Sequence, residues 1–93
     1  MHELDDIAQV FKALSDPLRL RILKLLKRHD SCREFSVCGL AEEIGISQPN
    51  VSHHLGILKA AKLIKCEKCE GFSYYVVNLD KFKEVIQSFY DEV

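Results

Sequence analysis

A long apolar run is absent from this sequence. Although 47% of its 93 residues are hydrophobic, no stretch is long enough to span a membrane, and none resembles a cleaved signal. Glycine and proline are scarce as well, at four and two residues, and the chain contains no repeat, low-complexity tract or linker. We therefore expect a single cytoplasmic domain that covers residues 1–93.

Signatures of catalysis are also missing. No pair of carboxylates, nucleophile–base arrangement or phosphate-binding loop stands out in the sequence. His53 and His54 are adjacent, but neighbouring residues on a helix face different ways, so we do not expect them to form a site together. The sequence therefore does not predict an enzyme.

Basic residues show no overall excess, because the formal net charge is −1. They are nevertheless concentrated in the middle of the chain. Residues 12–68 contain eleven Lys or Arg against six Asp or Glu, whereas residues 1–11 and 69–93 are both net acidic. These charges can be ordinary solvated surface, but their segregation favours a phosphate-bearing partner for the central segment.

Apolar residues at helical spacing dominate the first two thirds of the chain. Asp16 and Pro17 form a strong helix start, with Asp16 as the cap and Pro17 as the first helical residue. Ser36 can cap a later helix in the same way. The four predicted helices cover about residues 3–14, 17–28, 37–44 and 48–61.

The stretch 40–55 is the most informative part of the sequence. Gly45 can adopt the left-handed backbone that ends a helix. Ser47 can cap the next helix, and Pro49 lies in its first turn, where a missing N–H costs nothing. A short helix that braces a second helix across such a tight turn is a helix-turn-helix, whose second helix can enter the DNA major groove.

After residue 61 the hydrophobic pattern changes. Residues 63–68 and 72–79 read as two strands of a hairpin, and Asp80 can cap a last helix. A hairpin that directly follows a recognition helix is termed a wing. The predicted fold is therefore mostly α with a β-hairpin wing: a winged helix-turn-helix with a recognition helix at about 48–61 and a wing at about 63–79.

The predicted recognition helix carries short hydrogen-bonding side chains on its polar side. Gln48 and Asn50 can each donate and accept, so either can read adenine in bidentate fashion. The other polar residues suit phosphates or single bases, and His54 is expected to pack inside the domain. The candidate DNA-binding residues are Ser47, Gln48, Asn50, Ser52, His53, Lys59 and Lys62.

The first and last helices each carry an apolar stripe, and together they offer more apolar surface than a four-helix core requires. Both stripes can simply cover the chain's own core. A two-fold dimer, however, would match two DNA half-sites about one helical turn apart. We therefore expect a homodimer whose interface includes Leu4, Ile7, Phe11, Phe82, Val85 and Phe89.

The stretch 11–23 contains Leu-Ser-Asp-Pro-Leu-Arg, and the stretch 40–55 contains Ser-Gln-Pro-x-Val-Ser-x-His-Leu. These two motifs resemble those of the ArsR/SmtB family of metalloregulatory repressors. The segment 58–64 and the pair Tyr74-Tyr75 also look like that family. The resemblance implies a homodimer, joined through its first and last helices, that binds a pseudo-palindromic operator. It also implies release by a metal ion, a metalloid or a thiol-reactive species.

Four cysteines in a reducing cytosol suggest metal or redox chemistry. Thiolates select soft ions, and four of them suit zinc or a heavier relative. On a straight strand Cys66 and Cys69 would face opposite ways, so a shared ion requires a bend, which Gly71 permits. The cysteines can instead form a thiol–disulfide switch or have no function. The candidate ligands are Cys32, Cys38, Cys66 and Cys69.

The cysteine arrangement departs from the family that the chain resembles. Thiolate-sensing members carry a Cys-x-Cys pair at the start of the helix before the turn, where this chain has Ser36 and Cys38. Other members place Asp and His ligands on the last helix, but residues 80–93 contain no histidine. These departures leave the effector open.

The functional hypothesis is a DNA-binding transcriptional repressor of the ArsR type, released from operator DNA by a metal, a metalloid or a thiol-reactive effector. The cofactor that the sequence suggests is a thiolate-bound metal or metalloid. Two alternatives are a thiol–disulfide regulator and a winged-helix protein-interaction module that does not bind DNA. The polar recognition helix and the basic central segment favour DNA binding.

Overall fold

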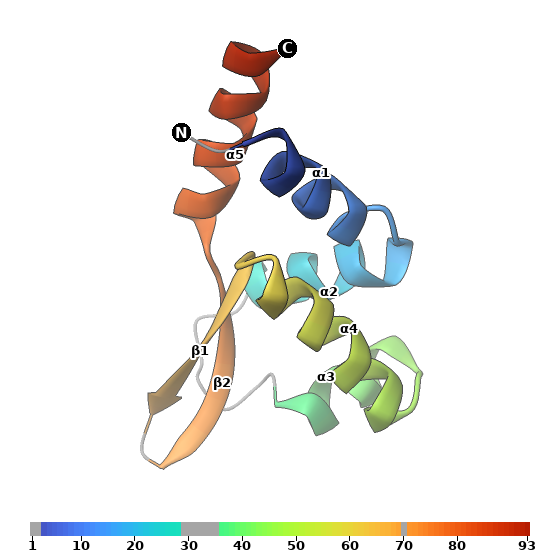
Figure 1. Cartoon of the computed structure of the whole chain (residues 1–93). Coiled ribbons are helices and arrows are strands. Elements are labelled where there is room, and N and C mark those ends of the chain that lie inside the picture. Colours follow the sequence, from blue (N-terminus) through green and yellow to red (C-terminus); the bar gives the residue numbers. More distant parts are fainter. Residues whose placement is uncertain (1–2, 29–35, 70) are drawn as a thin grey trace.

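The computed structural model describes residues 3–28, 36–69 and 71–93. It contains the predicted winged helix-turn-helix (Figure 1). No helix in the described ranges has the length and apolar content needed to cross a membrane. The elements are α1 (Leu4–Ala13), α2 (Pro17–Arg28), α3 (Val37–Ile44), α4 (Gln48–Ala60), β1 (Ile64–Cys69), β2 (Phe72–Val77) and α5 (Leu79–Glu92).

The capping residues Ser36, Gly45 and Ser47 begin or end α3 and α4 where the sequence predicts. The Ser36 hydroxyl accepts a hydrogen bond from Gly39 N at 3.2 Å, and Ser47 accepts one from Asn50 N at 3.3 Å. Gly45 ends α3 in the left-handed conformation, with φ of 82°. Each cap satisfies a backbone group that the helix leaves unpaired, so the turn between α3 and α4 is specified locally.

A single apolar core joins the helices to the base of the wing. Ile22, Leu40, Val51, Leu58 and Leu63 are fully buried at 0% exposure. They come from α2, α3, α4 and the start of the hairpin, so each element of the helix-turn-helix is packed against the others. Helix α1 packs on α5 at the opposite end of the molecule from the tip of the hairpin (Figure 1).

The wing is the antiparallel hairpin of β1 and β2. Ile64 pairs with Val77 and Cys69 with Phe72, and the register between them is regular. The bend that a chelate of Cys66 and Cys69 would need is therefore not present in β1. Gly71 has φ of 84°, a conformation that favours glycine, at the end of the hairpin.

The last helix begins two residues earlier than the sequence predicts. Asn78, not Asp80, is the cap: its Oδ1 accepts a hydrogen bond from Lys81 N at 3.4 Å. The Asn78 amide also donates to Lys62 O at 3.1 Å, so one side chain caps α5 and links it to the segment between α4 and β1. Asp80 lies in the first turn, where its charge favours the helix dipole.

Candidate nucleic-acid interface

The first half of α4 has a polar exposed side and an apolar buried side. Val51 and Leu55 are buried at 0% and 2% exposure. The polar side faces solvent, and its residues Gln48, Asn50, Ser52 and His53 are all exposed. We call this set of four residues the reading face. Its side chains can donate and accept hydrogen bonds, as reading of base edges in the major groove requires.

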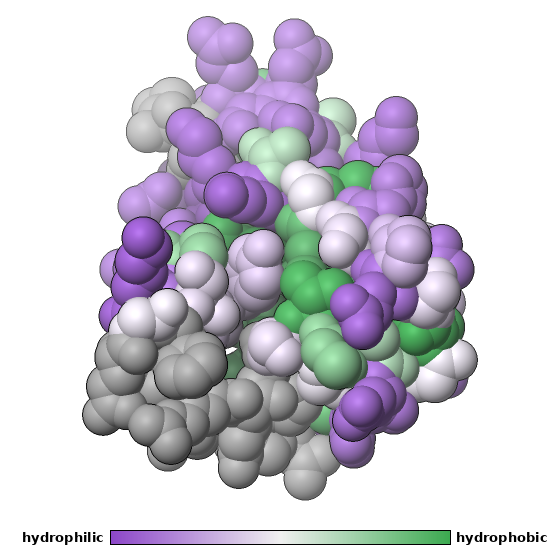
Figure 2. Space-filling model, turned by 90° about the horizontal axis from the view of Figure 1, so that it is seen from below, coloured by the Kyte–Doolittle hydropathy of each residue, from purple (hydrophilic) through white to green (hydrophobic). Residues whose placement is uncertain are grey.

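The reading face lies at the same end of the molecule as the wing. Seen from that end, mostly hydrophilic and neutral side chains surround a smaller apolar strip (Figure 2). The Ser47 hydroxyl lies at the N-terminus of α4 and already accepts the hydrogen bond from Asn50 N. Ser47 therefore fixes the start of α4, which carries the reading face, and its side chain is exposed.

Exposed lysines follow the reading face along the chain. Lys59 lies in the last turn of α4, and Lys62 precedes the wing with a left-handed backbone of φ 63°. Lys62 N donates to Lys59 O at 2.9 Å, which closes the end of the helix. Both ammonium groups can reach solvent, which suits contacts to a phosphate backbone.

The wing carries an acidic group that partly offsets its lysines. Lys65 Nζ lies 3.7 Å from Glu67 Oε1, and the Tyr74 hydroxyl donates to Glu67 Oε2 at 3.1 Å. This hydrogen bond raises the pKa of Tyr74, with smaller contributions from desolvation and from the charge of Glu67. Tyr74 therefore stays neutral at physiological pH, and Glu67 reduces the net positive charge of this part of the wing.

His54 points away from the reading face, as the sequence predicts. Its Nδ1 lies 3.3 Å from Arg19 Nη1, and its side chain is 12% exposed. Although the sequence predicts that His53 and His54 face different ways, their rings are in contact. Their rings meet edge to face with centroids 5.5 Å apart, because rotation about the side-chain bonds brings the two rings together.

The predicted interface residues of α1 and α5 fall into two groups. Ile7 and Val85 are buried in the chain's own core, at 4% and 1% exposure, and are not accessible to a second copy. Phe82 is half-buried. Leu4, Phe11 and Phe89 are exposed, so they are available to a partner, as are Ile86 and Tyr90 of α5 and Val93, which follows it.

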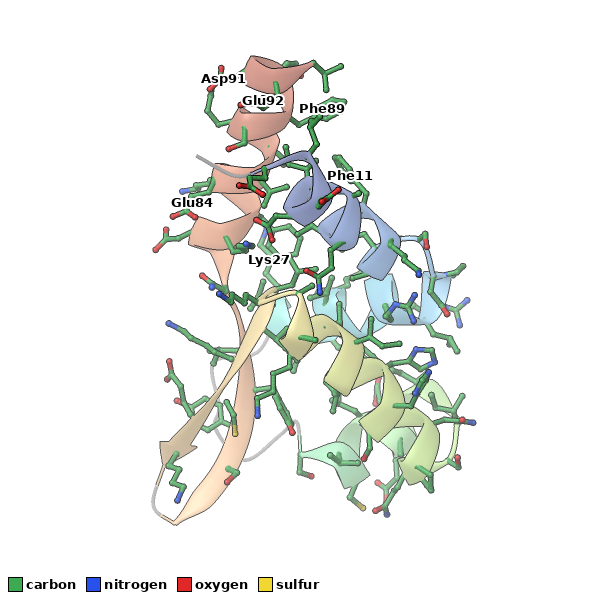
Figure 3. All side chains as sticks on the ribbon, in the orientation of Figure 1. Phe11, Lys27, Glu84, Phe89, Asp91 and Glu92 are labelled. Carbon is green, nitrogen blue, oxygen red and sulfur yellow. The ribbon has the colours of Figure 1, made fainter. Side chains whose placement is uncertain are left out.

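These exposed residues are placed as one surface by the contact of α1 with α5. Phe11 and Phe89 pack edge to face, with ring centroids 5.3 Å apart and an interplanar angle of 86°. Figure 3 shows both rings on the same side of the helix pair, whereas Glu84 and Asp91 extend from the other side of α5. We call the exposed residues Leu4, Phe11, Ile86, Phe89, Tyr90 and Val93 the apolar face. The predicted interface does not include Tyr90, because this residue lies at the edge of the apolar stripe of α5.

The cysteines are only partly placed. Cys38 and Cys66 are exposed free thiols, and Cys38 Sγ lies 3.9 Å from Glu42 Oε1. Cys32 and the side chain of Cys69 lie outside the described part of the chain. Within the described part, no three His, Cys, Asp or Glu side chains are grouped so as to hold a metal ion. The described residues therefore do not make a metal site by themselves.

Three relatives each match most of this chain. An uncharacterised helix-turn-helix-type transcriptional regulator of Methanocaldococcus jannaschii is 40% identical over 94% of each chain. The transcriptional repressor SdpR of Bacillus subtilis is 43% identical over 83% of this chain and 81% of its own. An arsenical resistance operon repressor of Staphylococcus aureus is 35% identical over 89% of this chain and 76% of its own.

Solved structures share the fold. An ArsR-like transcriptional regulator from Rhodococcus superposes with a TM-score of 0.82 and 28% identity, over 94% of this chain and 78% of its own. The homodimeric winged helix-turn-helix DNA-binding domain of a possible ArsR-family regulator from Mycobacterium bovis superposes with a TM-score of 0.73 and 30% identity. That match covers 96% of this chain and 82% of the domain.

Residues 16–65 match the family described as bacterial regulatory proteins of the arsR family. This segment begins at the cap of α2 and contains α3, the start of the wing, and α4, which carries the reading face. The chain therefore belongs to the arsR family, and it is a DNA-binding transcriptional regulator with a winged helix-turn-helix fold.

Proposed function

We propose that the chain is a cytoplasmic homodimeric repressor whose two α4 helices bind the half-sites of a pseudo-palindromic operator. We further propose that a thiol-directed effector releases it from DNA. The single observation that carries the dimer is the apolar face of α1 and α5. A DNA-binding dimer of this kind pairs its own symmetry with that of the operator.

The apolar face supports the dimer because its exposure is costly in a monomer. Phe11 and Phe89 are 42% and 37% exposed, while Tyr90 and Val93 are 74% and 83% exposed. Contiguous apolar residues of this size on a soluble domain mark an interaction surface. The homodimeric relative from Mycobacterium bovis has the same fold, which supports a second copy as the partner.

The reading face supports assignment of the base contacts to α4. Gln48 and Asn50 would read adenine, and Ser52 and His53 would contact single bases or phosphates. Ser47, Lys59 and Lys62 would contact the phosphate backbone, so we expect binding to weaken steeply as salt rises.

The exposed thiols support a thiol-directed effector. Cys38 lies on α3, which packs on α4, and Cys66 lies on the wing. A modification at either position can therefore disturb an element next to the reading face. Each tenfold loss of operator affinity requires only about 1.4 kcal/mol of coupling between the two sites.

Two effector chemistries remain candidates. Thiolates would hold a soft metal or metalloid, and relatives include regulators named for arsenical and cadmium resistance. A complete site would need Cys32 or Cys69 in addition to Cys38 and Cys66. Oxidation of the exposed thiols is the second candidate, because an accessible thiol can be oxidised reversibly.

A gel shift on the promoter region of the protein's own gene tests the proposal. The reduced protein should bind in a salt-dependent manner, and cadmium, arsenite or the oxidant diamide should release it. The matched control replaces all four cysteines by serine, which should bind DNA and ignore every effector. Absence of salt-dependent binding by the reduced protein would favour the protein-interaction module. If the effectors released the serine variant from DNA as readily as the wild-type protein, the thiols would be excluded as the effector site.

A further inference from the structure

Arg19 of α2 connects three elements that meet near the middle of the molecule. Its Nε donates to Ala13 O at 2.6 Å, and its Nη2 donates to Lys12 O at 3.4 Å, so it holds the end of α1. Its Nη1 lies 3.3 Å from His54 Nδ1 on α4. One guanidinium thus joins the last carbonyls of the first helix to the recognition helix.

Asp16 completes this arrangement. Its Oδ1 accepts from Leu18 N at 2.8 Å and caps α2. Its Oδ2 lies 3.7 Å from Arg19 Nη1 and 4.0 Å from His54 Nδ1. The side chains of Arg19 and His54 are each only 12% exposed. Hydrogen bonds that involve an ionised group are stronger than neutral ones, and partial burial limits competition from water.

Arg19 lies beside a hollow between α1 and α4. The hollow has a volume of about 370 Å³. Its lining residues are Gln9, Lys12, Ala13, Arg19, Ile57, Ala60 and Ala61. The closely contacting pairs of elements join α1 to α5, and α4 to α2, α3 and β1. Beside this hollow, the Arg19 guanidinium links the end of α1 to α4 by polar contacts, in addition to the apolar core that the two helices share.

We infer that Asp16, Arg19 and His54 position the recognition helix relative to α1, and we call these three residues the strut. This inference rests on the proposed homodimer. Because α1 contributes to the apolar face, its angle to α4 sets the separation of the two reading faces in the dimer. The strut residues are positioning residues that act through α4. They determine which spacing of half-sites the protein accepts.

The chemistry of the strut restricts which residues can replace its members. A guanidinium can only donate, so a hydrogen bond from Arg19 Nη1 requires His54 Nδ1 as its acceptor. Asparagine at position 54 can present an acceptor oxygen at a similar place, whereas leucine cannot. Lysine at position 19 keeps the positive charge, but it lacks the planar guanidinium. It therefore cannot donate to two backbone carbonyls and the His54 ring at the same time.

The test compares His54→Asn with His54→Leu. Half-sites are first selected from random DNA by the wild-type protein. Duplexes are then made at the selected spacing and with one or two base pairs added or removed. His54→Leu should bind the selected spacing about tenfold more weakly and lose most of the preference among spacings. Its affinity for a duplex without half-sites, and the salt dependence of that binding, should stay unchanged. His54→Asn should retain the preference.

A purely structural role for the strut predicts a different pattern. In that case His54→Leu would lower thermal stability and weaken binding to every duplex equally. Arg19→Lys supplies a second variant if His54→Leu does not fold, and it should broaden the spacing preference in the same way. An unchanged spacing preference in the folded variants would overturn the inference. Failure of the wild-type protein to select paired half-sites would overturn the proposed dimeric function instead.

Discussion

The reading face lies on α4 and the apolar face on α1 and α5, and the two faces differ in chemistry. The reading face exposes amide, hydroxyl and imidazole groups, which are well solvated when no partner is present. The apolar face exposes large hydrocarbon and aromatic surfaces, including Phe11 and Phe89. Polar side chains are hydrated in the absence of DNA, whereas burial of apolar side chains in a protein interface is favourable at all times. The comparison predicts a stable dimer and a reversible DNA complex.

A charge on the apolar face should have the largest effect. Phe89→Lys should produce monomers, because burial of an ammonium at an apolar interface is costly. Loss of one of two half-site contacts should lower operator affinity by about 100-fold or more. Sedimentation and gel shift measure the two effects. Gln87→Lys adds the same charge elsewhere on α5 and should change neither. A Phe89→Lys protein that remains dimeric would contradict the assigned interface.

Changes on the reading face should leave the dimer intact. Gln48→Ala and Asn50→Ala should each weaken operator binding by about tenfold, because a bidentate base contact contributes about 1–3 kcal/mol of discrimination. Binding to unrelated DNA should change little, and this provides the control in the same titration. Equal losses on operator and unrelated DNA would show that these amides do not read bases.

Helices α1 and α5 are joined by an ion pair, and the loss of stability should depend on which of its two residues is removed. Lys81 Nζ lies 3.2 Å from Asp6 Oδ2, and the Lys81 side chain is 8% exposed. Asp6→Ala should lower the free energy of unfolding by about 2 kcal/mol, because a buried charge loses its partner. Lys81→Met should cost less, since it leaves no buried charge. Urea unfolding measures both, and the reverse order would contradict this account.

The smallest effect should come from Lys62→Gly. The backbone at Lys62 has φ of 63°, so glycine should relieve about 1 kcal/mol of strain and raise the unfolding temperature. The same change removes a proposed phosphate contact, so operator affinity should fall and the salt dependence should become shallower by about one charge. Lys62→Asn is the control, because asparagine tolerates this backbone but also lacks the charge. Unchanged salt dependence in both variants would exclude the contact.

Local sequence signals predicted most of the fold, because they depend on neighbours in the chain. Ser36, Gly45 and Ser47 end or start helices through contacts within a few residues, and all three predictions are confirmed. The cap of α5 was assigned wrongly, because Asn78 and Asp80 are both good capping residues. Only the long-range bond from Asn78 to Lys62 O favours the first.

The candidate sites were harder to predict, because apolar spacing identifies a face but not what covers it. Ile7 and Phe11 belong to the same stripe, yet the first lies in the core and the second is exposed. The contact between Arg19 and His54 joins positions 35 residues apart. No local pattern reports such a pair, so the strut became visible only in the structure.

The central claim is that two chains, joined by the apolar face, present two reading faces to one operator. The most direct test is the number of chains bound to a labelled duplex with two selected half-sites, measured by sedimentation as protein is added. The account predicts that two chains bind together, with no complex that contains one chain. Stepwise binding of single chains, at the same affinity for one half-site as for two, would contradict it.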